Sequence, residues 1–203
     1  MEIDYNRITG KILLEIKMGN PSEYEKEFFK NLYPILGIEP KVIGYGDETN
    51  STEINILSCI DPIDKNVTFY GTIALNEQAQ HNEFEILMAS YTKNKHIPNI
   101  LSSCAFFIIK NKWKVKWGNI FETLVQEYYP KSLMKHLYFT KPYIWEDKLE
   151  KFIIKNRIIK FLLAIPISEN ELKYINEKGY KEFETVLENN NVDIFNINRK
   201  SII

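Results

Sequence analysis

Apolar positions near the start of the chain repeat at the spacing of an α-helix. Ser22 and Glu25 precede them at the spacing of a capping box, in which each side chain accepts a hydrogen bond from a backbone N–H. Pro34 follows the repeat and is expected to stop it. The pattern predicts a helix over residues 21–33, with one face buried by residues that recur every four positions: Tyr24, Phe28 and Leu32.

The next part of the chain changes to the period of a β-strand. Ile54 and Ile56 alternate with polar neighbours, and a turn at residues 46–51 separates them from an earlier strand. Asp61-Pro62 begins another turn. The pattern therefore predicts an antiparallel region in which further strands cover residues 66–75 and 83–91.

The second half of the chain mixes helical and strand patterns. Pro98 suits the first turn of a helix over residues 97–110, whose apolar side chains line one face. Strands are expected at residues 134–139 and in a hairpin that turns near Asn156. Strands cluster early and late with helices between them, which favours an α+β fold: a mixed, largely antiparallel sheet with helices packed on it.

The C-terminal third carries sharper helix signals. Ser168 and Glu171 repeat the capping-box spacing, and Gly179 stands where a left-handed residue commonly ends a helix. A second helix is expected over residues 180–190, followed by a strand at 192–197. We expect the closing segment to be structural, with Ile194 or Phe195 in the core and Arg199 paired with a carboxylate or with carbonyl groups.

Length and composition suggest a single domain over residues 1–203. The chain is 44% hydrophobic and 26% charged, which are globular values. No apolar run approaches the ~20 residues of a membrane span, and the start lacks the pattern of a signal peptide. Cys59 and Cys104 are isolated, so a reducing, cytoplasmic setting is expected.

The net charge of −1 hides an uneven distribution. Residues 1–92 carry seven basic and fifteen acidic side chains, whereas residues 93–160 carry fourteen basic and five acidic ones. Within the basic part, "KNKWKVKW" (110–117) alternates lysine with other residues, including two tryptophans. In a strand this would place lysines on one face and aromatics on the other, as in a nucleic-acid-binding stripe. The alternative, favoured by an isoelectric point near 6.3, is that the charges mix over the surface.

A search for catalytic or metal-binding spacing finds none. The three histidines form no pair at helical spacing, and the glycines of "GYGD" are too few for a dinucleotide-binding loop. Cys104 lies on the apolar side of its helix, where a small buried side chain is the common case. Glu83 and Glu85 would share one strand face, where they could bind a cation, but a solvated face is the simpler explanation. We therefore expect no enzyme activity, no metal and no cofactor.

Several motifs occur in the order in which one known family presents them. The chain strongly resembles the suppressor-of-fused (SUFU) domain family over roughly residues 35–203. Near the end, the family has a strand closing in P-I, an E-x-E-like helix start, a glycine, an aspartate and then R-K-S, all of which are present here. One departure is Ala74, where the family usually has glycine. Upstream, the resemblance is carried by "TFYGTIAL", "IPNILSSCAFFII" and "MKHLYFTKPYIWED".

The likeness is greatest to a small bacterial branch, the YqcF-type antitoxins. It implies an immunity protein that neutralises a cognate LXG-type toxin, often a nuclease, by stoichiometric occlusion. It also implies that Lys110 and Lys112 lie at the solvated end of a helix. A nucleic-acid-binding module that uses residues 110–117 is the alternative function. Aromatic side chains are frequent anchors at such interfaces. The candidates for partner binding are Trp113, Trp117, Tyr143 and Trp145.

Overall fold

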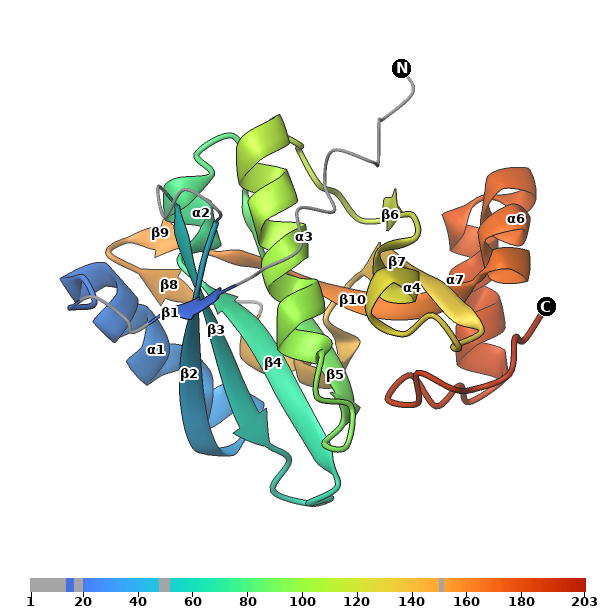
Figure 1. Cartoon of the computed structure of the whole chain (residues 1–203), viewed down its shortest axis with the longest axis horizontal. Coiled ribbons are helices and arrows are strands. Elements are labelled where there is room, and N and C mark those ends of the chain that lie inside the picture. Colours follow the sequence, from blue (N-terminus) through green and yellow to red (C-terminus); the bar gives the residue numbers. More distant parts are fainter. Residues whose placement is uncertain (1–13, 17–19, 48–51, 150–151) are drawn as a thin grey trace.

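An eight-stranded sheet forms the centre of the molecule, with strands in the order β1-β2-β3-β4-β5-β10-β7-β6 (Figure 1). The computed structural model describes residues 14–16, 20–47, 52–149 and 152–203. Neighbouring strands are antiparallel except β5 and β10, which run parallel. The predicted mixed, largely antiparallel sheet is confirmed. The strands are β1 (Leu14–Ile16), β2 (Ile38–Gly46), β3 (Glu53–Ile60), β4 (Val67–Ile73), β5 (Phe84–Tyr91), β6 (Ile120–Phe121), β7 (Met134–Thr140) and β10 (Lys160–Ser168).

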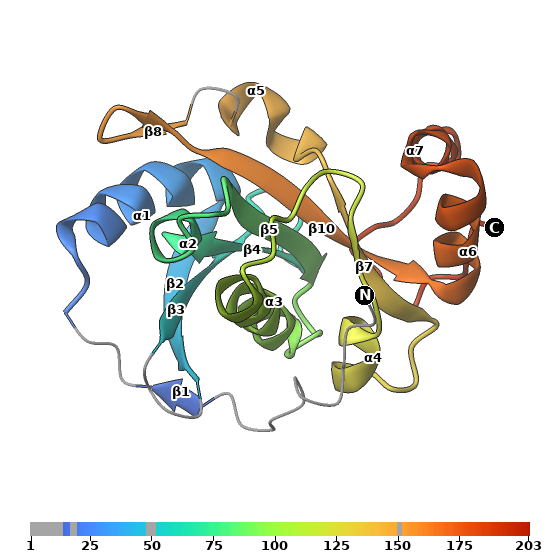
Figure 2. The same ribbon diagram turned by 90° about the horizontal axis from the view of Figure 1, so that it is seen from above.

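Helices cover both faces of this sheet. Figure 2 shows α3 within the curve of the sheet, with α1 and α5 on the opposite side. Because successive side chains of a strand point to opposite faces, β5 contributes Leu87 to one core and Ile86 to the other. The helical segments are α1 (Glu23–Leu36), α2 (Leu75–Gln78), α3 (Ile97–Asn111), α4 (Leu124–Tyr128), the 3₁₀ helix η2 (Tyr143–Trp145), α5 (Glu146–Leu149), α6 (Glu169–Lys178) and α7 (Tyr180–Asn189).

The α1 helix packs on the sheet through its predicted face. Phe28 and Leu32 are fully buried in the core, and the capping box of Ser22 and Glu25 is present. The helix nevertheless continues through Pro34 to Leu36, so the expected stop before the proline is wrong. Pro34 lies in the last turn, where one missing N–H costs a single intrahelical bond. That residues 1–203 form one domain stays a prediction.

A hairpin stands outside the main sheet. β8 (Ile153–Ile154) and β9 (Arg157–Ile158) form a separate two-stranded sheet that turns at Lys155 and Asn156, close to the predicted position. The chain then enters β10, which inserts between β5 and β7. This insertion brings residues 160–168 into the middle of the sheet.

The strand expected at residues 192–197 is absent, because the segment folds into successive turns. Within it, Asp193 Oδ1 accepts a hydrogen bond from the Phe195 N–H (3.2 Å). The Phe195 carbonyl in turn accepts from the Tyr91 N–H (3.1 Å), which ties the tail to the end of β5. Ile194 is buried and Arg199 bonds a carboxylate and carbonyl groups, so the placement expected for these two residues is confirmed.

The departure from the family motif has a backbone consequence. Ala74 has φ +61° and ψ +28°, a left-handed conformation that glycine adopts without steric cost. The residue is buried at the start of α2. The glycine that the family usually has at this position thus matches the local backbone geometry.

Candidate partner-binding surface

A half-buried polar cluster joins the loop after α3 to α7 and β7. Its centre is Glu184 Oε1, which accepts a hydrogen bond from the Trp117 indole N–H. The same oxygen accepts from the Tyr138 hydroxyl (2.9 Å) and from the Thr140 hydroxyl (2.5 Å). Burial and the adjacent Glu184 carboxylate raise the pKa of Tyr138, so this phenol remains a donor. The network fixes Trp117 against the sheet.

Two contacts complete the surroundings of Trp117. The ammonium group of Lys141 lies 4.4 Å from the centroid of the indole ring, a cation–π geometry. The Tyr180 ring packs edge-on against Trp117, with 5.6 Å between the ring centroids. Gly118 has φ +86°, and a Cβ there would lie 2.7 Å from the Tyr180 ring. The chain therefore needs glycine here to bring Trp117 next to α7.

The four aromatic candidates occupy different environments. Tyr143 is 48% exposed at the start of η2, which makes it the most accessible of them. Trp113 and Trp117 are half-buried; Trp113 packs edge-on against Phe107 and Phe139, both at 5.7 Å.

Trp145 does not belong to the surface. It is only 5% exposed and packs edge-on against Phe69, with 4.9 Å between ring centroids. The prolines and charges around "KPYIWED" suggested a surface loop, but the segment forms η2 and α5, whose apolar side turns inward. As an exposed anchor, Trp145 is a wrong expectation.

The lysine-rich segment after α3 is a loop rather than a strand. Helix α3 ends at Asn111, and Lys112 follows in a left-handed conformation. Lys112, Lys114 and Lys116 are exposed, whereas Trp113 turns toward the protein. The expected alternation is real, but its aromatic side is used for packing and offers no open face for stacked bases.

Ion pairs also join the acidic and basic parts of the chain. Lys110 Nζ lies 3.4 Å from Asp47 Oδ2, and Lys160 Nζ lies 2.6 Å from Glu83 Oε2. Each pair links a residue from the acidic first part to one from the basic middle. The interpretation that the charges interleave in space is thus supported.

The described residues contain no cluster of three or more histidine, cysteine or acidic side chains that could hold a metal ion. Cys59 and Cys104 are buried, and burial raises the pKa of both thiols. His136 is buried, which lowers the pKa of its imidazole; its Nδ1 accepts from the Thr123 N–H at 3.0 Å. The two sulfur groups and this imidazole are therefore occupied in packing and internal bonding.

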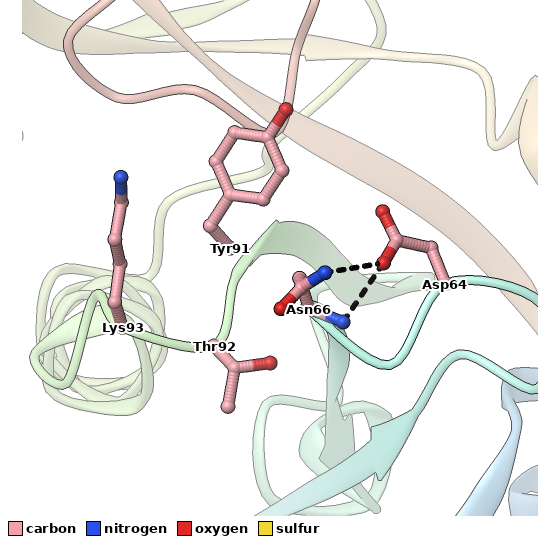
Figure 3. Close-up of a pocket in the computed structure, with 5 residues that line it drawn as sticks. All are labelled: Asp64, Asn66, Tyr91, Thr92 and Lys93. Carbon is pink, nitrogen blue, oxygen red and sulfur yellow. Dashed lines mark hydrogen bonds between the residues drawn. The ribbon is translucent and has the colours of Figure 1, made fainter.

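A shallow depression of about 420 Å³ lies where β4 and β5 meet the tail (Figure 3). Asp64 Oδ1 accepts hydrogen bonds from the backbone and side-chain N–H groups of Asn66. Tyr91 donates its hydroxyl to Asp193, at 2.9 Å. The polar groups of this depression thus largely bond to neighbours. Its lining residues are Asp64, Asn66, Tyr91, Thr92 and Lys93.

Sequence comparison assigns most of the chain to one family. The sequence profile described as Suppressor of fused protein (SUFU) matches residues 50–200. The chain belongs to the SUFU family. Within that family it is 32% identical over 193 residues to "Immunity protein YqcF" of Bacillus subtilis (strain 168), covering 92% of this chain and 100% of the relative.

Solved structures share the SUFU fold. A SUFU homologue from Neisseria gonorrhoeae FA 1090 superposes with a TM-score of 0.74 at 17% identity, covering 89% of this chain and 97% of that one. A chain of the Sufu–Fu complex gives a TM-score of 0.59 at 10% identity, covering 88% and 92%. Drosophila Suppressor of Fused also gives 0.59 at 10% identity, and the match covers 87% of this chain but 51% of that one.

The features that sequence reasoning missed are polar. Glu184, Lys141 and Tyr180 had no motif to mark them, because they act together with Trp117 only in the folded chain. None of the helices in the described part of the chain is both long and apolar enough to cross a bilayer.

Proposed function

We propose that this SUFU-family protein is an immunity protein that binds a cognate toxin and neutralises it. The observation that carries the proposal is the 32% identity to an immunity protein, spread over 92% of this chain and the whole of that relative. A match over the full length of a small protein includes its surface as well as its core.

Neutralisation by binding accounts for the chemistry of the described residues better than catalysis does. The buried thiols and the internally bonded His136 are not placed to act on a substrate. We propose stoichiometric occlusion, in which the folded surface covers the toxin's active site. An interface of ~800 Å² on each partner would suffice and requires no cofactor.

For the partner we propose an LXG-type toxin with a nuclease C-terminal domain, met in the cytoplasm. This finer assignment comes from the resemblance to the YqcF-type branch. Nucleic-acid binding by residues 110–117 is the weaker alternative, because Trp113 and Trp117 are packed inward and do not offer stacking faces.

Within the interface we propose Tyr143 as an anchor, with the exposed edge of the Trp117 ring as a second contact. Tyr143 is exposed, and tyrosine is a frequent anchor because it buries a large rigid area. Trp117 offers only its exposed edge, since its N–H is bonded to Glu184. Trp113 is a lesser candidate because it is half-buried.

Co-expression tests the proposal directly. The toxin probe is the product of the reading frame next to the gene for this protein. Cells that express it should survive only when this protein is also made, and the two purified proteins should elute together at one to one. A toxin that kills equally in the presence of this protein, with no complex on gel filtration, contradicts the immunity function.

A further inference from the structure

The β8–β9 hairpin presents an apolar pair to solvent. Ile153 and Ile158 are direct cross-strand partners, so their side chains lie on the same side of the ribbon. They are 53% and 67% exposed. The neighbouring residues Ile154 and Ile159 are buried in the core, so the hairpin is anchored on one side and bare on the other. In Figure 2 the hairpin lies at the periphery, between α1 and α5.

The hairpin is preformed. Lys155 and Asn156 form its turn with φ of +46° and +63°, the left-handed pair that gives a two-residue turn the twist of the flanking strands. The backbone of Ile159 bonds that of Phe152 at 2.9 Å, which closes the base of the ribbon. An apolar pair held on such a ribbon loses little conformational freedom when a partner covers it.

The hairpin itself carries only positive charge. Residues 151–168 contain no acidic side chain. Lys155 and Arg157 are exposed and form no ion pair with the side chains that the structure describes. Lys155 instead rests its ammonium group 5.6 Å from the ring centroid of Tyr24 on α1. On the flanking α5, Lys148 and Asp147 are both exposed, so the charge of that helix is mixed.

We infer that this surface, made of Ile153, Ile158, Lys155 and Arg157, docks a protein whose apolar patch is rimmed by carboxylates. The inference rests on the proposed function, under which that protein is the toxin. Apolar contact between the isoleucines and the patch supplies burial, and the two cations select for acidic neighbours. A second copy of this chain is a poorer occupant, because it would bring the same cations together.

The test uses the full-length protein and the neighbouring toxin in an affinity measurement. Ile153→Thr with Ile158→Thr keeps β-branched side chains on both strands and removes apolar area. The double variant should bind at least ~10-fold more weakly, and Arg157→Glu should also weaken binding, most at low salt. Matched controls are Ile63→Thr, at an isoleucine that is 93% exposed in another loop, and Lys65→Glu in the same loop. Both controls should bind like the wild type.

The outcomes separate the surface from the function. If the wild type binds the toxin and the double variant binds equally well with an unchanged unfolding midpoint, the docking surface is wrong and the immunity function stands. If the wild type does not bind the toxin, the proposed function fails and this inference fails with it. The wild type is also tested for binding to phosphatidylglycerol vesicles or duplex DNA, and for dimerisation. If the double variant loses one of these interactions but still binds the toxin, the surface belongs to another occupant and the inference is overturned.

Discussion

Arg199 Nη1 lies 2.6 Å from Glu171 Oε1, and Arg199 Nη2 lies 2.8 Å from Glu171 Oε2, so the two side chains form a bidentate pair. Glu171 is fully buried and Arg199 is 7% exposed. The carboxylate also accepts from the backbone N–H groups of Ser168 and Ile202. One buried carboxylate thus caps α6 and holds the C-terminal tail against it.

Replacing Arg199 with methionine should lower the free energy of unfolding by about 3–5 kcal/mol, because it leaves the Glu171 carboxylate buried without its cation. Urea denaturation measures the change. Lys200→Met is the matched control at the exposed neighbouring position and should change stability by less than ~0.5 kcal/mol. A loss below ~1 kcal/mol for Arg199→Met would show that the pair is not a significant support of the fold.

The titration of Glu85 should lower the free energy of unfolding as the pH rises. Its carboxyl is fully buried and accepts from the Thr72 hydroxyl (2.6 Å) and the Asn76 N–H (2.7 Å). Burial raises its pKa from 4.5 to about 7 despite these bonds. The folded chain therefore holds a proton that the unfolded chain releases between these values. This group's stabilisation is complete below pH 4.5 and is lost as pH rises through about 7.

The raised pKa of Glu85 corresponds to a loss of about 3 kcal/mol of unfolding free energy as the pH rises from 4.5 to above about 7. Unfolding free energies of the wild type and of Glu85→Gln, measured at pH 5 and pH 7.5, isolate it by difference. The wild type should lose more stability across the window than the variant does. Taking the difference also removes the contribution of His136, whose lowered pKa acts in the opposite direction. Parallel pH profiles for the two proteins would contradict the prediction.

Tyr143 and Trp145 should separate binding from folding. Trp145→Ala removes a buried ring that packs on Phe69 and should cost about 3–5 kcal/mol of stability. Tyr143→Ala changes an exposed side chain and should leave the unfolding midpoint nearly unchanged. If Tyr143 is an anchor for the toxin, its loss weakens binding about 30-fold. Equal toxin affinity in Tyr143→Ala and wild type would remove it from the interface.

Charge reversal in the lysine-rich loop tests the alternative function. Lys112, Lys114 and Lys116 are exposed, so changing all three to glutamate should not affect stability greatly. Under the immunity function, the wild type retains neither DNA nor RNA at physiological salt in a filter-binding assay. A salt-sensitive affinity in the wild type that the triple variant loses, without protection against the toxin, would favour the nucleic-acid-binding module.

Local sequence determined the elements whose signals lie within a few residues. The capping boxes at Ser22 and Ser168 start α1 and α6 as predicted, since a cap joins groups three residues apart. The periodicity of residues 97–110 likewise predicts α3. The motifs over residues 35–203 also sufficed to identify the SUFU family, because each is a short local sequence and all of them occur in the family's order.

Tertiary structure decided where charges and aromatic rings lie. Glu85, expected on a solvated strand face, is buried because α2 folds back over it and supplies the Asn76 N–H. Trp145 is buried by Phe69, which is distant in sequence. Residues 192–197 have strand composition but fold into turns, and the Phe195 carbonyl accepts a hydrogen bond from the Tyr91 N–H at the end of β5. A side chain's exposure depends on which distant segments cover it, and the spacing of residues along the chain does not encode that contact.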